Sequence, residues 1–347
     1  MYYKEGSESS QVLICLYVDD LLVIGSDSSE VGRFKELMKS EFEMSNQELM
    51  KSEFEMYDLG TLTYFLGLEF LYTNKGILMH QRKYTTNMLK WFKIMDCNHT
   101  ITPSKLYSRN EDIEDEERVD PTHYKKLIGS LRYLCNSRPD LSFTIGVASK
   151  HMHERRKSYL IVAKRILRYL KGTKDLGIQF PKNTNEKMDE LIGYCDSDWC
   201  GDKFDRRSTT GYLFMLAGAP ISWCSKKQLV VALSSCEAKY IVGTNASCQA
   251  VWLDSLLKGI KVKVKRPLHL MIDNQSTINL AKNPIAYGRS KHTETKFHFL
   301  REQVKKGIIE VTYCPTQDQP ADVLTKPVKV YWFLKKRDEL GVVSYLD

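Results

Sequence analysis

The chain has 347 residues, of which 42% are hydrophobic, and its 51 basic and 43 acidic side chains give a formal net charge of +8. This length and apolar content are sufficient for two or three compact domains, so disorder is not the default expectation. The basic excess permits a polyanionic partner without demanding one. Nine cysteines without a C-x-x-C pair indicate reduced thiols. Because the N-terminal segment is polar and no apolar run reaches the roughly 18 residues of a membrane span, we expect no signal peptide, no membrane partner and a cytoplasmic or nuclear location.

The first predicted element is a buried β-hairpin over residues 11–25, where two apolar, β-prone stretches flank a pair of aspartates. An amphipathic helix is expected from about Glu30. Within it the segment ELMKSEFEM of residues 36–44 recurs identically at residues 48–56. A 12-residue offset at about 100° per residue turns the apolar stripe by about 120°. The two copies therefore cannot both face one core on one straight helix. We expect either that residues 45–47 interrupt the helix or that one copy does not pack against the core.

A helical region is predicted in the middle of the chain. The acidic stretch EDIEDEE at residues 111–117 is the best candidate for a solvated linker, and the pattern is helical from Tyr124 to Gly172. Four basic residues recur at helical spacing near its end, and they form either a solvated face or a nucleic-acid track: Lys164, Arg165, Arg168 and Lys171. A second boundary is expected near residues 181–189.

The region after Leu191 alternates strands with helices. Three strands, LIGYCD, GYLFMLAG and ISWCSKK, precede a long helix from Ser234 to about Gly259. The strand LHLMID, helices near 276–283 and 293–306, the strand IIEVTYC and a terminal helix from Pro320 complete the region. This order predicts an α/β fold with a mixed five-stranded sheet and flanking helices.

Four acids of this region are predicted where elements begin or end. They are Asp196 at the end of the first strand, Glu237 in the first turn of the long helix, Asp273 at the end of the fourth strand and Asp322 in the first turn of the terminal helix. Singly, each also fits an ordinary turn or helix-start residue. A two-metal nuclease needs carboxylates from separate elements, because Mg²⁺ prefers oxygen ligands and two ions must be held against a phosphate.

Seven ordered motifs over about residues 190–330 resemble a known family. They are CDSDW, RRSTTGYLF, ISWCSKKQ, ALSSCEAKY, IDNQSTINLAKNP, SKHTETKFHFLRE and ADVLTKP. In this order they are similar to the ribonuclease H domain of Ty1/copia-type retrotransposon Pol polyproteins. The resemblance implies a ribonuclease H-like fold and an endonuclease that hydrolyses RNA in an RNA–DNA hybrid. It also implies two Mg²⁺ or Mn²⁺ ions as cofactors and no small-molecule cofactor.

The resemblance also assigns roles to individual residues. The catalytic, metal-binding acids of the family correspond to Asp196, Glu237, Asp273 and Asp322. Asp198 competes with Asp196 for the first position, and we favour Asp196 because it comes first as the strand ends.

Other residues of this region are candidates for supporting roles. His292 and His298 are candidate proton carriers, with ordinary polar roles as the alternative. Four basic residues are predicted to contact backbone phosphates, with solvated charge as the alternative: Arg206, Arg207, Lys226 and Lys227.

The front of the chain resembles a different enzyme of the same lineage. Tyr17-Val18-Asp19-Asp20 is similar to the Y-x-D-D signature of reverse transcriptases, and MYDLGTLTYFLGLEF and YKKLIGSLRYLCNSRPDLSF match Ty1/copia Pol. In that class the paired acids hold metal with a third aspartate from an earlier strand, so Asp19 and Asp20 are predicted metal ligands. Only 18 residues precede Asp19. We therefore expect the earlier strand to be missing and the polymerase to be inactive.

The resemblance predicts four regions. They are a truncated α+β reverse transcriptase palm and thumb remnant (1–105), a linker and helical connection (106–187), the ribonuclease H-like domain (188–330) and a C-terminal helical tail (331–347). The leading hypothesis is a retrotransposon Pol-derived ribonuclease H, for which intact Pol of a related element would be a further partner. The alternative is a non-catalytic nucleic-acid-binding remnant of a decayed retroelement.

Overall fold

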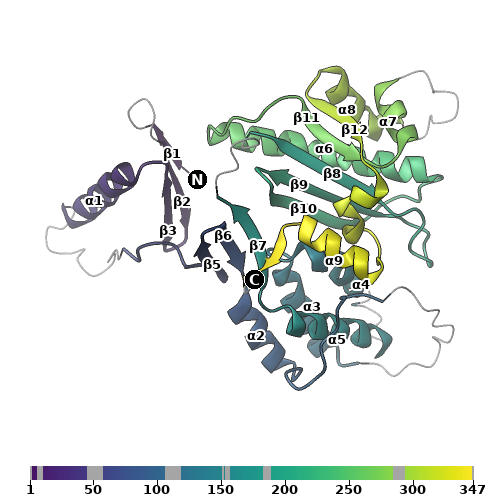
Figure 1. Ribbon diagram of the computed structural model, residues 1–347, viewed down its shortest axis with the longest axis horizontal. Coiled ribbons are helices and arrows are strands. Elements are labelled where there is room, and N and C mark those ends of the chain that lie inside the picture. The colour runs from purple at the N-terminus through teal and green to yellow at the C-terminus, as the bar shows by residue number, and fades with distance from the viewer. Residues whose placement is uncertain are drawn as a thin grey trace. The chain divides into compact units, whose positions relative to one another are not determined.

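The computed structural model describes residues 2–5, 11–44, 58–105, 119–150, 152, 157–182, 189–283 and 294–345 (Figure 1). Contacts within the chain divide it into two compact units. One unit comprises residues 1–62 and 256–262, and the other comprises residues 63–255 and 263–347. The predicted domain boundaries at residues 105, 187 and 330 stay predictions.

The first unit contains a small antiparallel sheet with the strand order β1-β2-β3. The bounds of these strands are β1 (Tyr2–Glu5), β2 (Gln11–Tyr17) and β3 (Asp20–Gly25). Tyr17 pairs with Asp20, so Val18 and Asp19 form a two-residue turn in which Val18 has a left-handed φ of 51°. The predicted β-hairpin over residues 11–25 is confirmed.

The expectation that this hairpin is buried is wrong for many of its side chains. Val12 and Ile14 are buried, whereas Leu16, Tyr17 and Val18 are each more than half exposed. Successive residues of a strand point to opposite faces, and an antiparallel sheet can pack on one face and leave the other in water. The continuous apolar run in the sequence therefore overstates the burial of these strands.

The predicted helix after the hairpin is α1 (Ser28–Met44). The carboxylate of Asp27 accepts hydrogen bonds from the backbone N–H and the hydroxyl of Ser29, at 2.8 and 2.7 Å. This pairing supplies an acceptor at the helix start, where backbone donors lack partners. The first copy of ELMKSEFEM ends with α1. Residues 45–47 and the second copy at 48–56 lie outside the described residues.

The second unit contains an antiparallel sheet that the sequence patterns did not predict. Its strand order is β13-β7-β6-β5-β4. The bounds of its strands are β4 (Tyr64–Phe65), β5 (Leu68–Thr73), β6 (Gly76–His80), β7 (Leu176–Pro181) and β13 (Val342–Ser344). The strands β4, β5 and β6 pair locally, whereas β7 and β13 come from later parts of the unit, and a local hydrophobic pattern carries no information about that distant pairing.

Helices described between β6 and β7 include α2 (Arg82–Trp91), α3 (Pro121–Leu134), α4 (Ser142–Lys150) and α5 (Lys157–Gly172). The last three confirm the helical pattern predicted from Tyr124 to Gly172. Asp120 caps α3, because its carboxylate accepts hydrogen bonds from the first backbone N–H groups of the helix. The predicted acidic linker at residues 111–117 lies outside the described residues.

The basic residues near the end of α5 are largely engaged within the protein. Arg165 donates to the hydroxyl of Thr102 at 3.1 Å, and Arg168 and Lys171 each donate to a backbone carbonyl of residues 97–98 at 2.6 Å. These bonds fasten the segment before the linker onto α5. They favour a structural role for this face over a nucleic-acid track.

The second sheet of this unit is the predicted mixed five-stranded sheet, which confirms the expected fold class. Its order is β10-β9-β8-β11-β12, with β8, β9 and β10 antiparallel and β11 parallel to both β8 and β12. The strand bounds are β8 (Leu191–Ser197), β9 (Thr209–Leu216), β10 (Ala219–Lys227), β11 (Leu268–Ile272) and β12 (Ile309–Tyr313). The predicted helices appear as α6 (Ser235–Gly259), α7 (Gln275–Lys282) and α8 (Glu294–Lys305).

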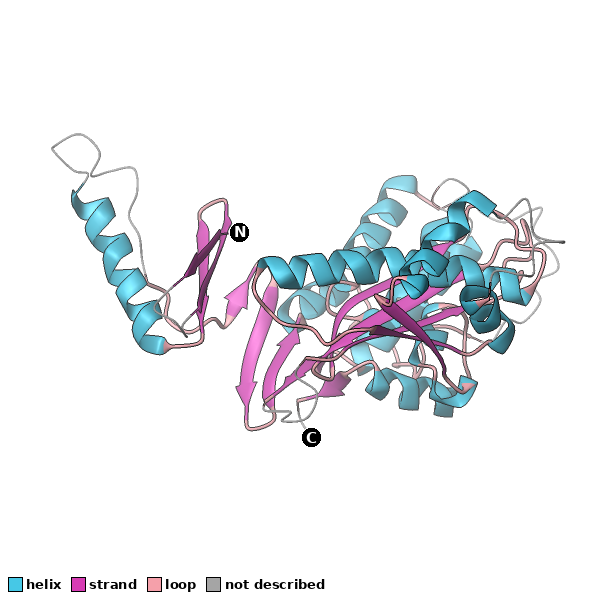
Figure 2. Cartoon of the chain, turned by 90° about the horizontal axis from the view of Figure 1, so that it is seen from above, coloured by secondary structure: helices cyan, strands magenta, loops and turns pink. Residues whose placement is uncertain are grey.

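Helices pack against both faces of this sheet (Figure 2). On one face, Leu213 of β9 belongs to the same buried core as Leu131 of α3 and Ile166 of α5. On the other face, Gln249 of α6 donates a hydrogen bond to the hydroxyl of Ser222 in β10 at 3.1 Å. The sheet is therefore a central layer, and the ends of its strands are where side chains from different elements can meet.

The terminal helix expected from Pro320 is wrong as a single element. Residues Pro320–Leu324 form a short 3-10 helix, η5, and the α-helix α9 (Val330–Glu339) begins later. Pro327 lies between them. A proline lacks a backbone N–H and disfavours helical geometry in the residue before it, so one helix cannot continue through this position.

Candidate active site

Asp196 lies near the end of β8, the central strand of the five-stranded sheet. Its side chain is fully buried, and its carboxylate accepts hydrogen bonds from Lys239 Nζ at 2.8 Å and from the Thr325 hydroxyl at 2.5 Å. Burial alone would raise the pKa of Asp196, but the nearby ammonium groups of Lys326 and Lys239 hold this pKa well below its ordinary value. Asp196 is therefore ionised and neutralised by neighbouring cations.

Asp273 follows β11, the parallel neighbour of β8, so its side chain lies at the same edge of the sheet as Asp196. The register pairs Ile272 with Cys195, which brings the residues that follow them together. Lys239 of α6 donates a hydrogen bond to the Asp273 carboxylate as well as to Asp196. The Thr316 hydroxyl donates to the second oxygen of Asp273 at 3.2 Å. One ammonium group thus joins the acids that end two adjacent strands.

Asp322 approaches the same edge from η5. Its buried carboxylate has Lys326 Nζ 2.6 Å from Oδ1 and Lys336 Nζ 3.1 Å from Oδ2. Lys326 Nζ is also 3.4 Å from Asp196 Oδ2, so it lies between the two acids. Burial and the nearby Asp196 charge raise the pKa of Asp322 despite both lysines. Asp196 and Asp322 are therefore close enough to influence each other's ionisation.

Glu237 is in the first turn of α6, as predicted, but its carboxylate turns back toward the helix start. It accepts a hydrogen bond from the Leu233 N–H at 2.8 Å, and the Ser234 hydroxyl accepts one from the Glu237 N–H at 3.1 Å. This reciprocal pattern is typical of helix capping. In this conformation Glu237 serves the helix terminus, and the contacts of the described residues do not join it to the other three acids.

Asp198, the alternative to Asp196, has a different environment. Its carboxylate accepts a hydrogen bond from the Thr209 N–H, and burial together with the nearby Asp196 charge raises its pKa to about 6. Asp196 shares Lys239 with Asp273, whereas the carboxylate of Asp198 accepts its hydrogen bond from the start of β9. The geometry favours Asp196 as the member of the acid cluster.

The residues predicted to contact phosphates divide into two kinds. Lys227 Nζ lies 2.6 Å from Asp202 and 2.5 Å from Asp205, and Arg207 Nε lies 3.8 Å from Asp205. These pairs reduce the positive charge that Lys227 and Arg207 present to a ligand. Two further residues are exposed at the surface: Arg206 and Lys226.

The remaining predicted residues lie outside the acid cluster or outside the described residues. Asp19 and Asp20 are exposed at the hairpin turn of the first unit. His298 is exposed on α8, and His292 lies outside the described residues. No hydrogen bond or ion pair joins the described side chains of Asp19, Asp20 and His298 to the three acids.

Lysines and hydroxyl groups of the site were not identified from the sequence. The missed partners of the acids are Lys239, Thr316, Thr325, Lys326 and Lys336. Lys239 follows Glu237 by two residues, and Thr325 and Lys326 follow Asp322 within the motif ADVLTKP. Comparing the acidic and basic residues within each motif could have identified Lys239 and Lys326 as partners, because several buried acids need nearby cations.

The side chains present fit divalent cations as ligands. Within the described part of the chain no three acidic, histidine or cysteine side chains already form a metal-binding group. Ammonium groups instead lie between the acids. Asp196, Asp273 and Asp322 nevertheless supply carboxylate oxygens from three separate elements, which is the ligand type that Mg²⁺ and Mn²⁺ prefer.

Comparisons with known proteins give a consistent set of relatives. The chain is 35% identical over 96% of its length to the retrovirus-related Pol polyprotein from transposon RE1 of Arabidopsis thaliana, and 33% identical over 99% to that from transposon TNT 1-94 of Nicotiana tabacum. It spans 22% and 25% of the lengths of these polyproteins. It is also 33% identical over 69% of its length to the uncharacterized mitochondrial protein AtMg00810 of Arabidopsis thaliana, of which it covers 93%. No protein-family model matches the chain.

Among solved structures, the chain is similar to LC11-RNase H1 in complex with an RNA/DNA hybrid. The sequence identity is 12% and the TM-score is 0.30, over 39% of this chain and 94% of that one. Separately, none of the described helices combines the length and the apolar character needed to cross a membrane.

Proposed function

Because the chain belongs to the family of retrovirus-related Pol polyproteins of copia-type transposons, we propose that its ribonuclease H-like part hydrolyses the RNA strand of RNA–DNA hybrids. The observation that carries the proposal is the convergence of Asp196, Asp273 and Asp322 at one edge of the sheet. Keeping several carboxylates together in a buried place is costly unless cations neutralise them. A cation-binding function gives a reason for this arrangement.

The proposed cofactors are two Mg²⁺ or Mn²⁺ ions, held by Asp196, Asp273, Asp322 and Glu237. Such ions lower the pKa of an attacking water and stabilise the leaving 3′ oxygen. Thr325 orients the Asp196 carboxylate and Thr316 orients that of Asp273, each by a donated hydrogen bond. These hydroxyl groups act as positioning residues, because they limit the rotation of carboxylates that must bind cations in fixed geometry.

Two side chains have to change their contacts for this function. Lys239 occupies the space between Asp196 and Asp273, so its ammonium group must leave when a metal ion binds there. Glu237 must exchange its bond with the Leu233 N–H for a metal ion, and it starts from the turn of α6 that also carries Lys239. Both changes are rotations of long side chains and require no change in the fold.

A non-catalytic role is the second candidate, and the lysines favour it. Lys239, Lys326 and Lys336 already neutralise the three acids without metal. A chain in which these pairs persist would bind nucleic acid through its basic surface and cleave nothing.

The front of the chain has a separate proposal. We propose that Asp19 and Asp20 are motif residues of a reverse transcriptase-like hairpin, and that the 347-residue chain does not synthesise DNA by itself. Both are exposed on a two-residue turn, and the described part of the first unit places no third carboxylate beside them. Two-metal nucleotide transfer needs such a third acid and a surface that holds template and nucleotide.

Cleavage of an end-labelled RNA–DNA hybrid by the 347-residue chain tests the two candidates directly. The ribonuclease H proposal expects cleavage of the RNA strand with Mg²⁺ or Mn²⁺ and none with EDTA. An RNA–RNA duplex of the same sequence should stay intact. Binding of the hybrid without cleavage at any metal concentration would support the non-catalytic role instead.

A further inference from the structure

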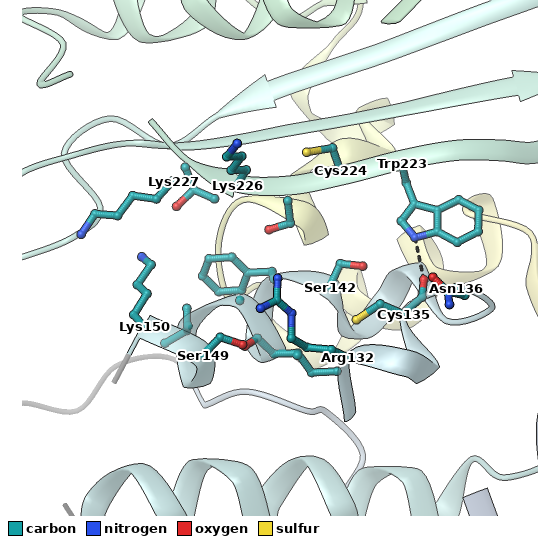
Figure 3. Close-up of a pocket in the computed structure, with 16 residues that line it drawn as sticks. Arg132, Cys135, Asn136, Ser142, Ser149, Lys150, Trp223, Cys224, Lys226 and Lys227 are labelled. Atoms are coloured by element: carbon teal, nitrogen blue, oxygen red, sulfur yellow. Dashed lines mark hydrogen bonds between the residues drawn. The ribbon is translucent and has the colours of Figure 1, made fainter. Parts of the chain in front are cut away.

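A cleft lies on the face of the five-stranded sheet that is covered by α3 and α4 (Figure 3). Its volume is about 420 Å³, and its walls come from these two helices and from β9 and β10. The charged residues of its lining are Arg132, Lys150, Lys226 and Lys227, and polar residues such as Ser142 and Thr209 lie beside them. The cleft therefore lies between the helical part of the second unit and its five-stranded sheet.

The two walls are fastened at both ends. Trp223 of β10 donates a hydrogen bond from its indole N–H to the backbone carbonyl of Cys135, just after α3, at 2.9 Å (Figure 3). At the other end Asp202 bridges Lys150 of α4 and Lys227 of β10, with distances of 3.4 and 2.6 Å. These contacts hold the helices at a fixed separation from the strand, so the cleft exists before any ligand binds.

The lining is suited to an anion. No carboxylate belongs to the described residues that line the cleft, whereas cations reach it from both walls. Asp202 neutralises part of the charge of Lys150 and Lys227. Arg132 and Lys226 differ, because no described residue places a carboxylate within 4.0 Å of either cationic group, and only Arg132 offers a planar guanidinium. Figure 3 shows this group directed from α3 toward the β10 side of the cleft.

The cleft also adjoins the acid cluster. Thr209 lines the cleft, and its backbone N–H donates to the carboxylate of Asp198, two residues beyond Asp196. A polymer bound across the acids can therefore continue toward the cleft. A guanidinium group is a common protein partner of a phosphate, which it binds by paired hydrogen bonds.

We propose that this cleft binds one backbone phosphate of the nucleic acid, with Arg132 as its main contact. The identity of the polymer as an RNA–DNA hybrid rests on the proposed function. The substrate interface then extends beyond the ribonuclease H-like sheet onto α3 and α4, and a phosphate some distance from the cut is held by the helical part of the chain.

Hybrid binding by the full 347-residue chain in EDTA tests this proposal without cleavage. Arg132→Gln should weaken binding about tenfold at low salt and lower the slope of log K against log salt by about 0.9, the value for one phosphate contact. The matched control is Lys126→Gln, which removes one charge from an exposed position of α3 that does not line the cleft. It should bind like the parent. Equal losses in the two variants would overturn the proposal, because they would reflect overall charge.

Hybrids with a single methylphosphonate, which removes the charge of one phosphate, locate the contact. One position should weaken binding by the parent and by Lys126→Gln but leave binding by Arg132→Gln unchanged. The absence of any such position would overturn the proposal.

The cleavage assay separates this inference from the proposed function. If the parent cleaves the hybrid but Arg132→Gln binds as tightly as the parent, the cleft proposal alone fails. If one methylphosphonate weakens binding by the parent but not by Arg132→Gln, and no metal ion supports cleavage, the cleft proposal stands and the proposed hydrolysis fails. If the parent does not bind the hybrid, the cleft proposal is overturned.

Discussion

Two groups of aspartates in this chain were identified from sequence motifs and lie in opposite environments. Asp19 and Asp20 are exposed at the turn of a hairpin in the first unit. Asp196, Asp273 and Asp322 lie where strands of the five-stranded sheet end in the second unit, and each forms an ion pair with a lysine ammonium group. A motif therefore identifies acids of interest, but the surrounding fold decides whether they form a site.

The physical difference is the requirement for counter-charge. Water stabilises an exposed carboxylate, so Asp19 and Asp20 need no partner. The buried Asp196 does need partners, and Lys239, Lys326 and Thr325 supply them. A buried cluster of acids is thus a set of cation sites whether the cation is an ammonium group or a metal ion.

The largest effect is expected from Asp273→Asn. The amide keeps the shape of the side chain but lacks the negative charge that would hold a metal ion, so cleavage of the hybrid should fall to the level seen with metal alone. Binding of the hybrid in EDTA should remain close to that of the parent. Glu310→Gln, an exposed change on the neighbouring strand β12, should cleave normally. Undiminished cleavage by Asp273→Asn would place the activity elsewhere.

The next effect tests the lysine that joins two of the acids. Lys239→Met leaves Asp196 and Asp273 without their shared cation, which should lower the free energy of unfolding in EDTA by about 3–5 kcal/mol, the usual cost of stranding a buried charge. Added Mg²⁺ should then stabilise the variant more than the parent, because metal no longer competes with the ammonium group. Urea unfolding with and without Mg²⁺ measures both the loss of stability and the stabilisation by the metal ion. Lys305→Met, an exposed change on α8, is the control. An identical response to Mg²⁺ in variant and parent would argue against metal binding between these acids.

The part of the site that could be predicted from the sequence is the part that depends on local pattern. Asp196 and Asp273 end apolar strands, and parallel strands meet at one edge, so their proximity follows from recognising the strands. Lys336 could not be predicted as a partner of Asp322, because that contact requires η5 to pack against α9. Glu237 has the predicted position on α6, yet its rotamer depends on the competition between helix capping and metal binding.

The same distinction between local pattern and distant contacts applies to the fold. The strands β8 to β12 were predicted because each is a short apolar run between turn residues. The sheet that contains β13 was not, because β13 pairs with β7 across a long separation in sequence. The single terminal helix from Pro320 was wrong because Pro327 interrupts the helical pattern. Local composition therefore identifies elements, and long-range pairing decides how they assemble.

A smaller effect is expected at a buried carboxylate that has no role in the acid cluster. Asp140 accepts hydrogen bonds from Arg138 and from the Tyr169 hydroxyl, and these partners keep its pKa below the ordinary value although burial opposes them. Such a group stabilises the fold above its unfolded pKa, and this contribution is lost as the pH falls below about 4. Tyr169→Phe should lower the unfolding free energy by about 1.5–3 kcal/mol at pH 7, and by less at pH 3. A difference that is equal at both pH values, measured by urea unfolding, would show that the hydroxyl acts without the Asp140 charge.

The smallest effect is expected from changing both hairpin aspartates to asparagine, Asp19→Asn with Asp20→Asn. Because both side chains are exposed, the unfolding free energy should change by no more than about 0.5 kcal/mol. Cleavage of the hybrid should be unaffected, since these residues contribute no ligand to the acid cluster. Neither the parent nor the variant should extend a primer on an RNA template with Mg²⁺ and nucleotides supplied. Template-directed extension by the parent that disappears in the variant would instead make the exposed pair a working metal site, and the contrast between the two groups of aspartates would no longer hold.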